Sequence, residues 1–308
     1  MKDLRDPFLI EQINFLRAHT GNQLIYAEQC DLSSLHSIRL FATKWIDNAP
    51  PRRLDSIILC AAVSPPPLFP QKLTADGLPE VWGVNYLANF HLLTLLAPAI
   101  RAQPPDRDVR VIVATCGSFM LSGPLSEHLS DPHFTARKYP SRAPWRATGA
   151  ANLALMTFMV EFNRRLRTYK RKDGMPVNAR TFLIDPGFAR TPGTRRFLTL
   201  GSLWGLLAYF LTWPLWWLVL KSPSQASQSF LFASMSPECG EGEGGFLYRE
   251  CTKGVIRREE VLNEELGRKL WEASEKEIAD VEKKSALERK KQEKEGNKAS
   301  KHGDKDTK

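Results

Sequence analysis

Glycines, cysteines and histidines are the residues of this 308-residue sequence with spacings worth testing for chemistry. The stretch GEGEGG places Gly240, Gly242 and Gly245 at the G-x-G-x-x-G spacing that can hold a pyrophosphate. That motif needs a strand before it and a helix after it, and neither is predicted around GEGEGG. Glu241 and Glu243 would also repel phosphate. We therefore interpret the stretch as an acidic surface loop.

The thiols and imidazoles form no metal-ligand or catalytic pattern. The cysteines are odd in number and none forms a C-x-x-C pair, which is typical of reduced thiols in a cytosol-facing protein. His91 and His128 have no acidic residue spaced to orient them, so each is expected to be an ordinary core or surface imidazole. No metal site is predicted. The five cysteines are Cys30, Cys60, Cys116, Cys239 and Cys251.

The elements that must position any site alternate between strands and helices. Apolar runs bounded by turn residues read as strands buried on both faces, and this alternation favours an α/β fold with a doubly wound parallel sheet. The predicted strands are 23–29, 56–63, 109–116, 178–185 and 245–250. The predicted helices are 7–19, 31–46, 78–103, 145–174 with a basic end, and 222–238.

Charge is concentrated at the end of the chain. The formal net charge is +9, and residues 281–308 hold ten Lys or Arg against six Asp or Glu. A basic protein suits anionic membranes or nucleic acid, but no aromatic residues are interleaved in the tail, so specific nucleic-acid binding is not expected. From about Glu275 the composition cannot bury a core. We predict a domain over 1–255 and a charged helical or disordered tail over 256–308.

An apolar segment without formal charge runs from Phe197 to Leu220, flanked by Arg195, Arg196 and Lys221. As one helix its 24 residues would reach about 36 Å, long enough to cross a bilayer. Pro214 interrupts it, however, and its tryptophans prefer the membrane–water interface. We expect a membrane-associating element that lies on a membrane or dips into one, with a spanning helix and a buried apolar lid as alternatives.

Several stretches, taken in order, resemble the short-chain dehydrogenase/reductase family, in particular its retinol-dehydrogenase-like branch, which includes fungal members associated with lipid droplets. The resemblance runs from about residue 11 to residue 251. It implies a Rossmann-like fold and NAD(P)-dependent interconversion of a lipophilic alcohol and a carbonyl. The stretches that carry it are CDLSSLHSIRLFA, DSIILCAAV, GLPEVWGVNYLANFHLL, RVIVATCGS, DPGFART, LKSPSQASQSFLFASMSPE and GGFLYREC.

The resemblance implies a catalytic group of Asn, Ser, Tyr and Lys, of which the Asn alone is present, as Asn85. Cys116 stands at the Ser position, Trp145 at the Tyr position and Gly149 at the Lys position. No tyrosine in the chain is followed by a lysine four residues later. An indole N–H does not release a proton at neutral pH, and glycine has no charge. The thiol of Cys116 retains only a weak hydrogen bond.

The resemblance also assigns positions around a cofactor, NADP or NAD. Asp31 corresponds to the residue near the adenine and Ala61 to a strand end. Pro186 and Gly187 form the turn that touches the nicotinamide, and Thr191 follows them. The sequence begins after the strand, glycine-rich turn, helix and strand with which the family opens. Without that unit, either 23–29 pairs directly with 56–63 or an apolar edge stays open to association.

The predicted function is that of an N-terminally truncated, short-chain-dehydrogenase-like oxidoreductase whose catalysis is impaired or absent. The alternatives are a membrane-bound scaffold or partner subunit, and a residual enzyme that uses Cys116 or a water. The expected partners are a lipophilic small molecule, a membrane or lipid-droplet surface, and a second protein or a second copy. The expected location is the endoplasmic reticulum membrane or a lipid droplet, facing the cytosol.

Overall fold

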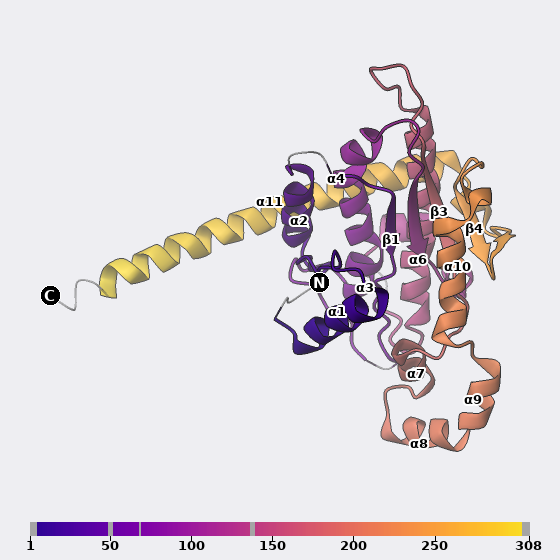
Figure 1. Ribbon diagram of the computed structural model, residues 1–308. Helices are drawn as coiled ribbons and strands as arrows, with labels where there is room; N and C mark the ends of the chain where they lie inside the picture. The colour runs from indigo at the N-terminus through magenta and orange to yellow at the C-terminus, as the bar shows by residue number, and fades with distance from the viewer. Residues whose placement is uncertain (1–4, 49–51, 68, 136–138, 304–308) are drawn as a thin grey trace.

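The computed structural model describes residues 5–48, 52–67, 69–135 and 139–303, the backbone alone over 288–303 (Figure 1). Its sheet has the order β1-β2-β3-β4-β5. The first four strands are parallel, and β5 returns antiparallel to β4. The predicted parallel sheet is thus confirmed. The strands are β1 (Ser56–Leu59), β2 (Val109–Ala114), β3 (Ala179–Asp185), β4 (Phe246–Arg249) and β5 (Thr252–Gly254).

The helices begin and end where capping residues and prolines occur in the sequence. Ser34 caps α2, and Ser222 with Gln225 forms a capping box at α10. A π-helical turn, η1 (Gly83–Leu87), joins α3 to α4. The helices are α1 (Pro7–Thr20), α2 (Leu35–Ile46), α3 (Glu80–Trp82), α4 (Ala88–Arg101), α5 (Leu125–Ser130), α6 (Trp145–Thr168), α7 (Pro192–Leu198), α8 (Leu203–Leu211), α9 (Trp213–Val219), α10 (Pro223–Met235) and α11 (Glu264–Gly303), with 3-10 turns η2 (Gly117–Leu121), η3 (Pro237–Cys239) and η4 (Glu259–Val261).

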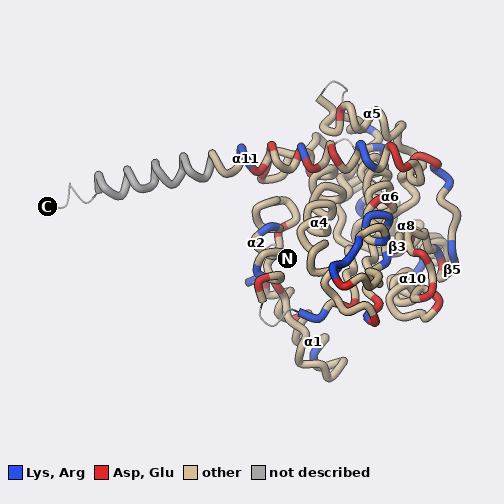
Figure 2. The backbone as a smooth tube through the Cα atoms, turned by 90° about the horizontal axis from the view of Figure 1, so that it is seen from above, with Lys and Arg blue, Asp and Glu red and all other residues tan. Residues whose placement is uncertain are grey.

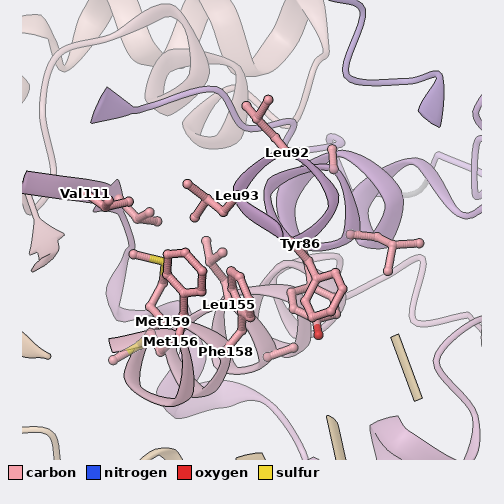
Figure 3. Packing of buried hydrophobic residues seen from close by; sticks show 14 of the residues in the cluster. Tyr86, Leu92, Leu93, Val111, Leu155, Met156, Phe158 and Met159 are labelled. Atoms are coloured by element: carbon pink, nitrogen blue, oxygen red, sulfur yellow. The ribbon is translucent and has the colours of Figure 1, made fainter. Parts of the chain in front are cut away.

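The larger part of the core lies on the face of the sheet covered by α4 and α6. Figure 3 shows Leu93 of α4 between Val111 of β2 and Leu155 and Met159 of α6. Successive strand residues point to opposite faces, so Ile112 belongs to a second, smaller cluster under α10. The sheet is therefore covered on both faces from β2 to β4, as a doubly wound fold requires.

The strand predicted at residues 23–29 is wrong. Residues 23–29 form no strand, and Leu24 and Tyr26 are 83% and 61% exposed. Nor is β1 buried on both faces, because α10 does not reach it and Ile58 is 47% exposed. Among the described residues β1 is an edge strand. The open edge, the second of the two expected outcomes, is what the structure contains.

The last helix, α11, starts inside the folded body. Trp271 packs on Phe90, Phe158 and Phe162, with ring centroids 5.1, 5.6 and 6.3 Å apart, and the Arg165 guanidinium lies 3.9 Å from its ring centroid. Charged residues of both signs lie along this part of the helix (Figure 2). Figure 1 shows α11 continuing away from the body.

The expectation that no core residue follows Glu275 is wrong, because Ile278 is 6% exposed. Its i+4 spacing from Ser274, which is also buried, keeps it on the face of α11 that packs against the body. The division of the chain into 1–255 and 256–308 remains a prediction.

The apolar segment 197–220 is not one helix. α7 ends at Leu198, the turn at Leu200 and Gly201 has positive φ, and α8 and α9 follow as two short helices. Pro214 lies in the first turn of α9, where its missing N–H costs nothing. Trp204 is 82% exposed, so the segment is not a buried lid.

Among the described residues, one helical run is long and apolar enough to cross a bilayer. This run is Glu80–Arg101, and 78% of its most apolar 18-residue stretch is buried. Since it packs between the sheet and α11, it is a core helix of this fold.

Candidate functional site

The carboxyl ends of β1, β2 and β3 lie at one edge of the sheet, because these strands are parallel. The four predicted catalytic positions all belong to this edge. Asn85 lies in η1, Cys116 follows β2, and Trp145 and Gly149 lie in the first turns of α6. The turn η2 packs against α6 and brings the residues after Cys116 to Gly149.

Asn85 holds the chain segment that leaves β1. Its side-chain oxygen accepts from the Val63 amide at 2.7 Å, and its amide donates to the Val63 carbonyl at 2.9 Å. Asn85 is 2% exposed, so these bonds satisfy a buried side chain. The residue therefore positions backbone at the edge of the site.

Cys116 belongs to a small polar group that the sequence did not single out. Its Sγ lies 2.9 Å from Ser118 Oγ, and Asn152 donates from Nδ2 to both atoms at 3.0 Å. The only signals for Ser118 and Asn152 were their places in the quoted stretches CGS and AAN. The group offers a hydroxyl and a thiol that can hydrogen-bond a carbonyl oxygen.

Gly149 is required by a close approach of backbone. A Cβ at this position would lie 2.3 Å from the Ser118 carbonyl oxygen and 3.3 Å from Ser122 Cβ. Because the nearer atom is backbone, any larger side chain would have to move η2 away from α6. The turn thus occupies the space through which a lysine at position 149 would extend.

Trp145 makes an aromatic contact outside the polar group. Its ring meets that of Phe197 in α7 edge to face, with centroids 6.0 Å apart. This contact links the first residue of α6 to the apolar segment that begins at α7. Trp145 therefore has a packing partner.

Tyr139 is the tyrosine nearest in sequence to the start of α6. Burial raises the pKa of its phenol, and the charge of Glu80 raises it further. Its ring packs edge to face on Phe134 with centroids 5.8 Å apart. A tyrosine that serves as general acid and base needs its pKa lowered toward neutrality, usually by a neighbouring cation. Tyr139 is shifted in the opposite direction.

The positions assigned to the cofactor make local contacts within the chain. Asp31 closes a turn, accepting from Ser33 N at 2.9 Å and Ser33 Oγ at 2.7 Å. Gly187 has φ +70°, and its Cβ position lies 3.3 Å from the Lys221 ammonium, which pairs with Glu250 at 2.7 Å. Lys221 thus covers the turn at Pro186 and Gly187.

The remaining two cofactor positions follow β1 and precede α7. Ala61 is exposed in the segment after β1. The hydroxyl of Thr191 caps α7 by accepting from Thr194 N at 3.3 Å. A cavity near the start of α6, lined by Pro65, Trp82, Tyr139 and Ala147 among others, has a volume of about 10 Å³, roughly room for one water. None of the five positions assigned to the cofactor lines this cavity.

The loop at Gly240–Gly245 is confirmed as a surface loop. It precedes the strand β4, and Glu241 and Glu243 are exposed. A larger cavity, of about 620 Å³, lies beside this loop, between the end of α6 and β5. It is at the opposite edge of the sheet from Cys116.

The parallel sheet, the covering helices and the position of the polar group define an α/β protein of the dehydrogenase type. No protein-family model matches the chain. It is 42% identical over 278 residues to an uncharacterized oxidoreductase, pbr1, of Schizosaccharomyces pombe, covering 90% of this chain and 73% of the relative. It is 31% identical over 259 residues to human retinol dehydrogenase 13, covering 84% and 70%. The chain belongs to the short-chain dehydrogenase/reductase family.

Two further comparisons concern ligands. Human polyprenol dehydrogenase is 28% identical over 264 residues, covering 85% of this chain and 72% of that protein. The NADPH-bound structure of a short-chain oxidoreductase from Pseudomonas aeruginosa, which contains an atypical catalytic center, superposes with a TM-score of 0.51 at 16% identity, covering 82% and 85%. At that identity the structural likeness shows the fold alone.

Proposed function

We propose that this chain is a short-chain dehydrogenase/reductase-like protein that binds a lipophilic alcohol or carbonyl and does not convert it at the family's rate. The observation that carries the proposal is the Ser118 carbonyl in the space beside Gly149. Because backbone fills this space, replacing Gly149 by lysine would not by itself restore a lysine to the site. General acid–base catalysis contributes about 10²–10⁴-fold to a rate, and the residues at positions 145 and 149 do not supply it.

The lipophilic ligand class is supported by the relatives. Retinol dehydrogenase 13 and polyprenol dehydrogenase are named for long apolar alcohols. The nucleotide used by the family is NADP or NAD, and the similar structure from Pseudomonas aeruginosa contains bound NADPH. Binding of either nucleotide to this chain would require Lys221 to leave the turn at Gly187. If bound, the nucleotide would supply or accept a hydride.

The decisive experiment measures binding and turnover on the same purified chain. Thermal shift in mild detergent with NADPH and NADH tests binding, since a ligand stabilises the folded state by mass action. Reduction of long-chain aldehydes and ketones, and oxidation of the matching alcohols, tests turnover. The proposal expects turnover no greater in the wild type than in Cys116→Ala and Ser118→Ala. Turnover that both substitutions abolish would instead identify a residual enzyme built on this polar group.

A second candidate function is a membrane-bound scaffold or partner subunit, and the edge strand β1 favours it. An exposed apolar edge with unpaired backbone groups is a template for association. Phe8 and Phe15 of α1 are also exposed, at 67% and 61%. Co-purification of one stoichiometric protein from the native membrane would support this candidate, and a monomeric, partner-free extract would count against it. The endoplasmic reticulum membrane or a lipid droplet remains the proposed location, with the chain facing the cytosol.

A further inference from the structure

The helices α8 and α9 meet at an angle through Thr212, and this pair, called the hairpin below, has an outer surface that is apolar and exposed. Leu203 and Trp204 are 85% and 82% exposed, and Leu211 and Leu218 are 77% and 78% exposed. Neither helix contains a charged residue. The hairpin lies at the same end of the molecule as α7, away from α11 (Figure 1). A protein–protein surface usually carries a rim of mixed polar residues, whereas the charged residues of segment 186–237 are all basic.

The hairpin is held together by side-chain packing between its two helices. Tyr209, 6% exposed, stacks on Trp216 at 6.1 Å and meets Trp213 edge to face at 5.7 Å. Gly205 allows α8 to begin against the end of α7, because a Cβ there would lie 2.0 Å from the Thr199 carbonyl oxygen. The inward aromatic residues thus hold the two helices together and leave the outward apolar residues facing solvent.

Basic residues surround the base of the hairpin. Arg195 and Arg196 are exposed in α7, and Arg190 lies 5.3 Å from the ring centroid of Trp217. No Asp or Glu occurs anywhere from residue 186 to residue 237. An apolar tip with a cationic base is complementary to a bilayer that carries anionic headgroups, with each exposed cation adding to the attraction.

We propose that α8 and α9 insert into one leaflet of an anionic phospholipid membrane, with Arg195 and Arg196 at the headgroups. The lengths limit the depth: 9 and 7 residues correspond to about 14 and 11 Å of helix, against a hydrocarbon core of about 30 Å. The hairpin therefore does not span. Tryptophans at the hairpin suit the interfacial depth. This docking does not depend on whether the site at Cys116 converts a substrate.

Docking would place the candidate site next to the lipid. Phe197 of α7 leads directly into the hairpin and contacts Trp145 at the start of α6. The edge of the sheet that holds Cys116 is the edge from which α7 extends. A lipophilic ligand would then approach the site from the membrane and not from water.

Vesicle flotation of the purified full chain tests the docking. Vesicles of phosphatidylcholine with phosphatidylserine are compared with vesicles of phosphatidylcholine alone. The wild type is expected to float with the anionic vesicles, and its tryptophan emission is expected to shift to shorter wavelength. The tip variant Leu203→Glu with Trp204→Glu is expected to bind at least about tenfold more weakly. Arg195→Ala with Arg196→Ala is expected to lose the preference for the anionic vesicles.

The matched control is Val255→Glu with Leu262→Glu, which places the same two charges at apolar residues that are 80% and 53% exposed, away from the hairpin. It is expected to bind like the wild type. Circular dichroism shows whether each variant is folded. We expect all of them to fold, because the altered residues are exposed. A folded tip variant that floats like the wild type would overturn the proposal. A wild-type protein that binds neither kind of vesicle would also overturn the proposal, even if the hairpin were found to contact another protein.

Discussion

The carbonyl oxygen of Ser118 lies 2.3 Å from the position that a Cβ at Gly149 would take. The turn η2 and the helix α6 are therefore in close contact at the position that we predict to correspond to the family's lysine. The backbone around this position leaves room for glycine and not for a longer side chain. The glycine at position 149 and the close packing of η2 on α6 therefore depend on each other.

Gly149→Ala is expected to destabilise the protein by about 1–3 kcal/mol. Alanine is the better helix former by about 1 kcal/mol, so the contact with Ser118 must outweigh that gain. Urea unfolding measures the difference. Gly117→Ala is the control, since a Cβ there meets no atom within 4 Å. A Gly149→Ala protein at least as stable as the wild type would show that η2 moves freely from α6.

Asn85→Leu is expected to cost about 1–3 kcal/mol, because the Val63 N–H and carbonyl both lose their buried partner. Hydrogen exchange of the Val63 amide should accelerate. Asn89→Leu is a matched control on the same helical run: Asn89 is also buried, but its amide donates to the Asn85 carbonyl at 2.8 Å. Unchanged exchange at Val63 in Asn85→Leu would contradict the positioning role.

His91 makes stability depend on pH. Burial lowers its pKa from 6.5 to about 4; Glu282, 3.4 Å away, raises the pKa and Arg39 lowers it. The unfolded state therefore binds the proton more readily. The neutral form contributes stability above pH 6.5, and up to about 3 kcal/mol is lost as the pH falls from 6.5 toward 4.

Thermal unfolding across this pH range measures the effect. His91→Leu should flatten the acid side of the profile, and His19→Leu, at an exposed residue, should leave it as in the wild type. A His91→Leu profile as steep as that of the wild type would assign the acid sensitivity to other groups.

Trp271→Ala is expected to destabilise the protein by about 3–5 kcal/mol, as removal of a large buried aromatic side chain usually does. The substitution also removes the Arg165 contact. Leu287→Ala, at a 54% exposed residue of the same helix, should change the unfolding free energy by less than about 0.5 kcal/mol. Equal effects of the two substitutions in urea unfolding would mean that α11 does not belong to the core.

Local patterns in the sequence were sufficient for the elements whose neighbours are close at hand. The apolar runs at 109–116 and 178–185 predicted β2 and β3, because a strand covered on both faces needs apolar residues throughout. The GEGEGG stretch was read correctly from its context. Residues 23–29 were misread, because a strand forms only where a partner strand is available for its hydrogen bonds.

By itself the sequence determined the α/β fold, the family and the absence of tyrosine and lysine from the expected catalytic positions. Tertiary structure alone decided how those positions are filled. The approach of Ser118 to Gly149, the bonds from Asn152 to Cys116, and the packing of Trp271 on α6 join residues that are 31, 36 and more than 100 positions apart. It also divided the segment 197–220 into two short helices. Such contacts depend on how distant segments pack, and no periodicity in the chain encodes them.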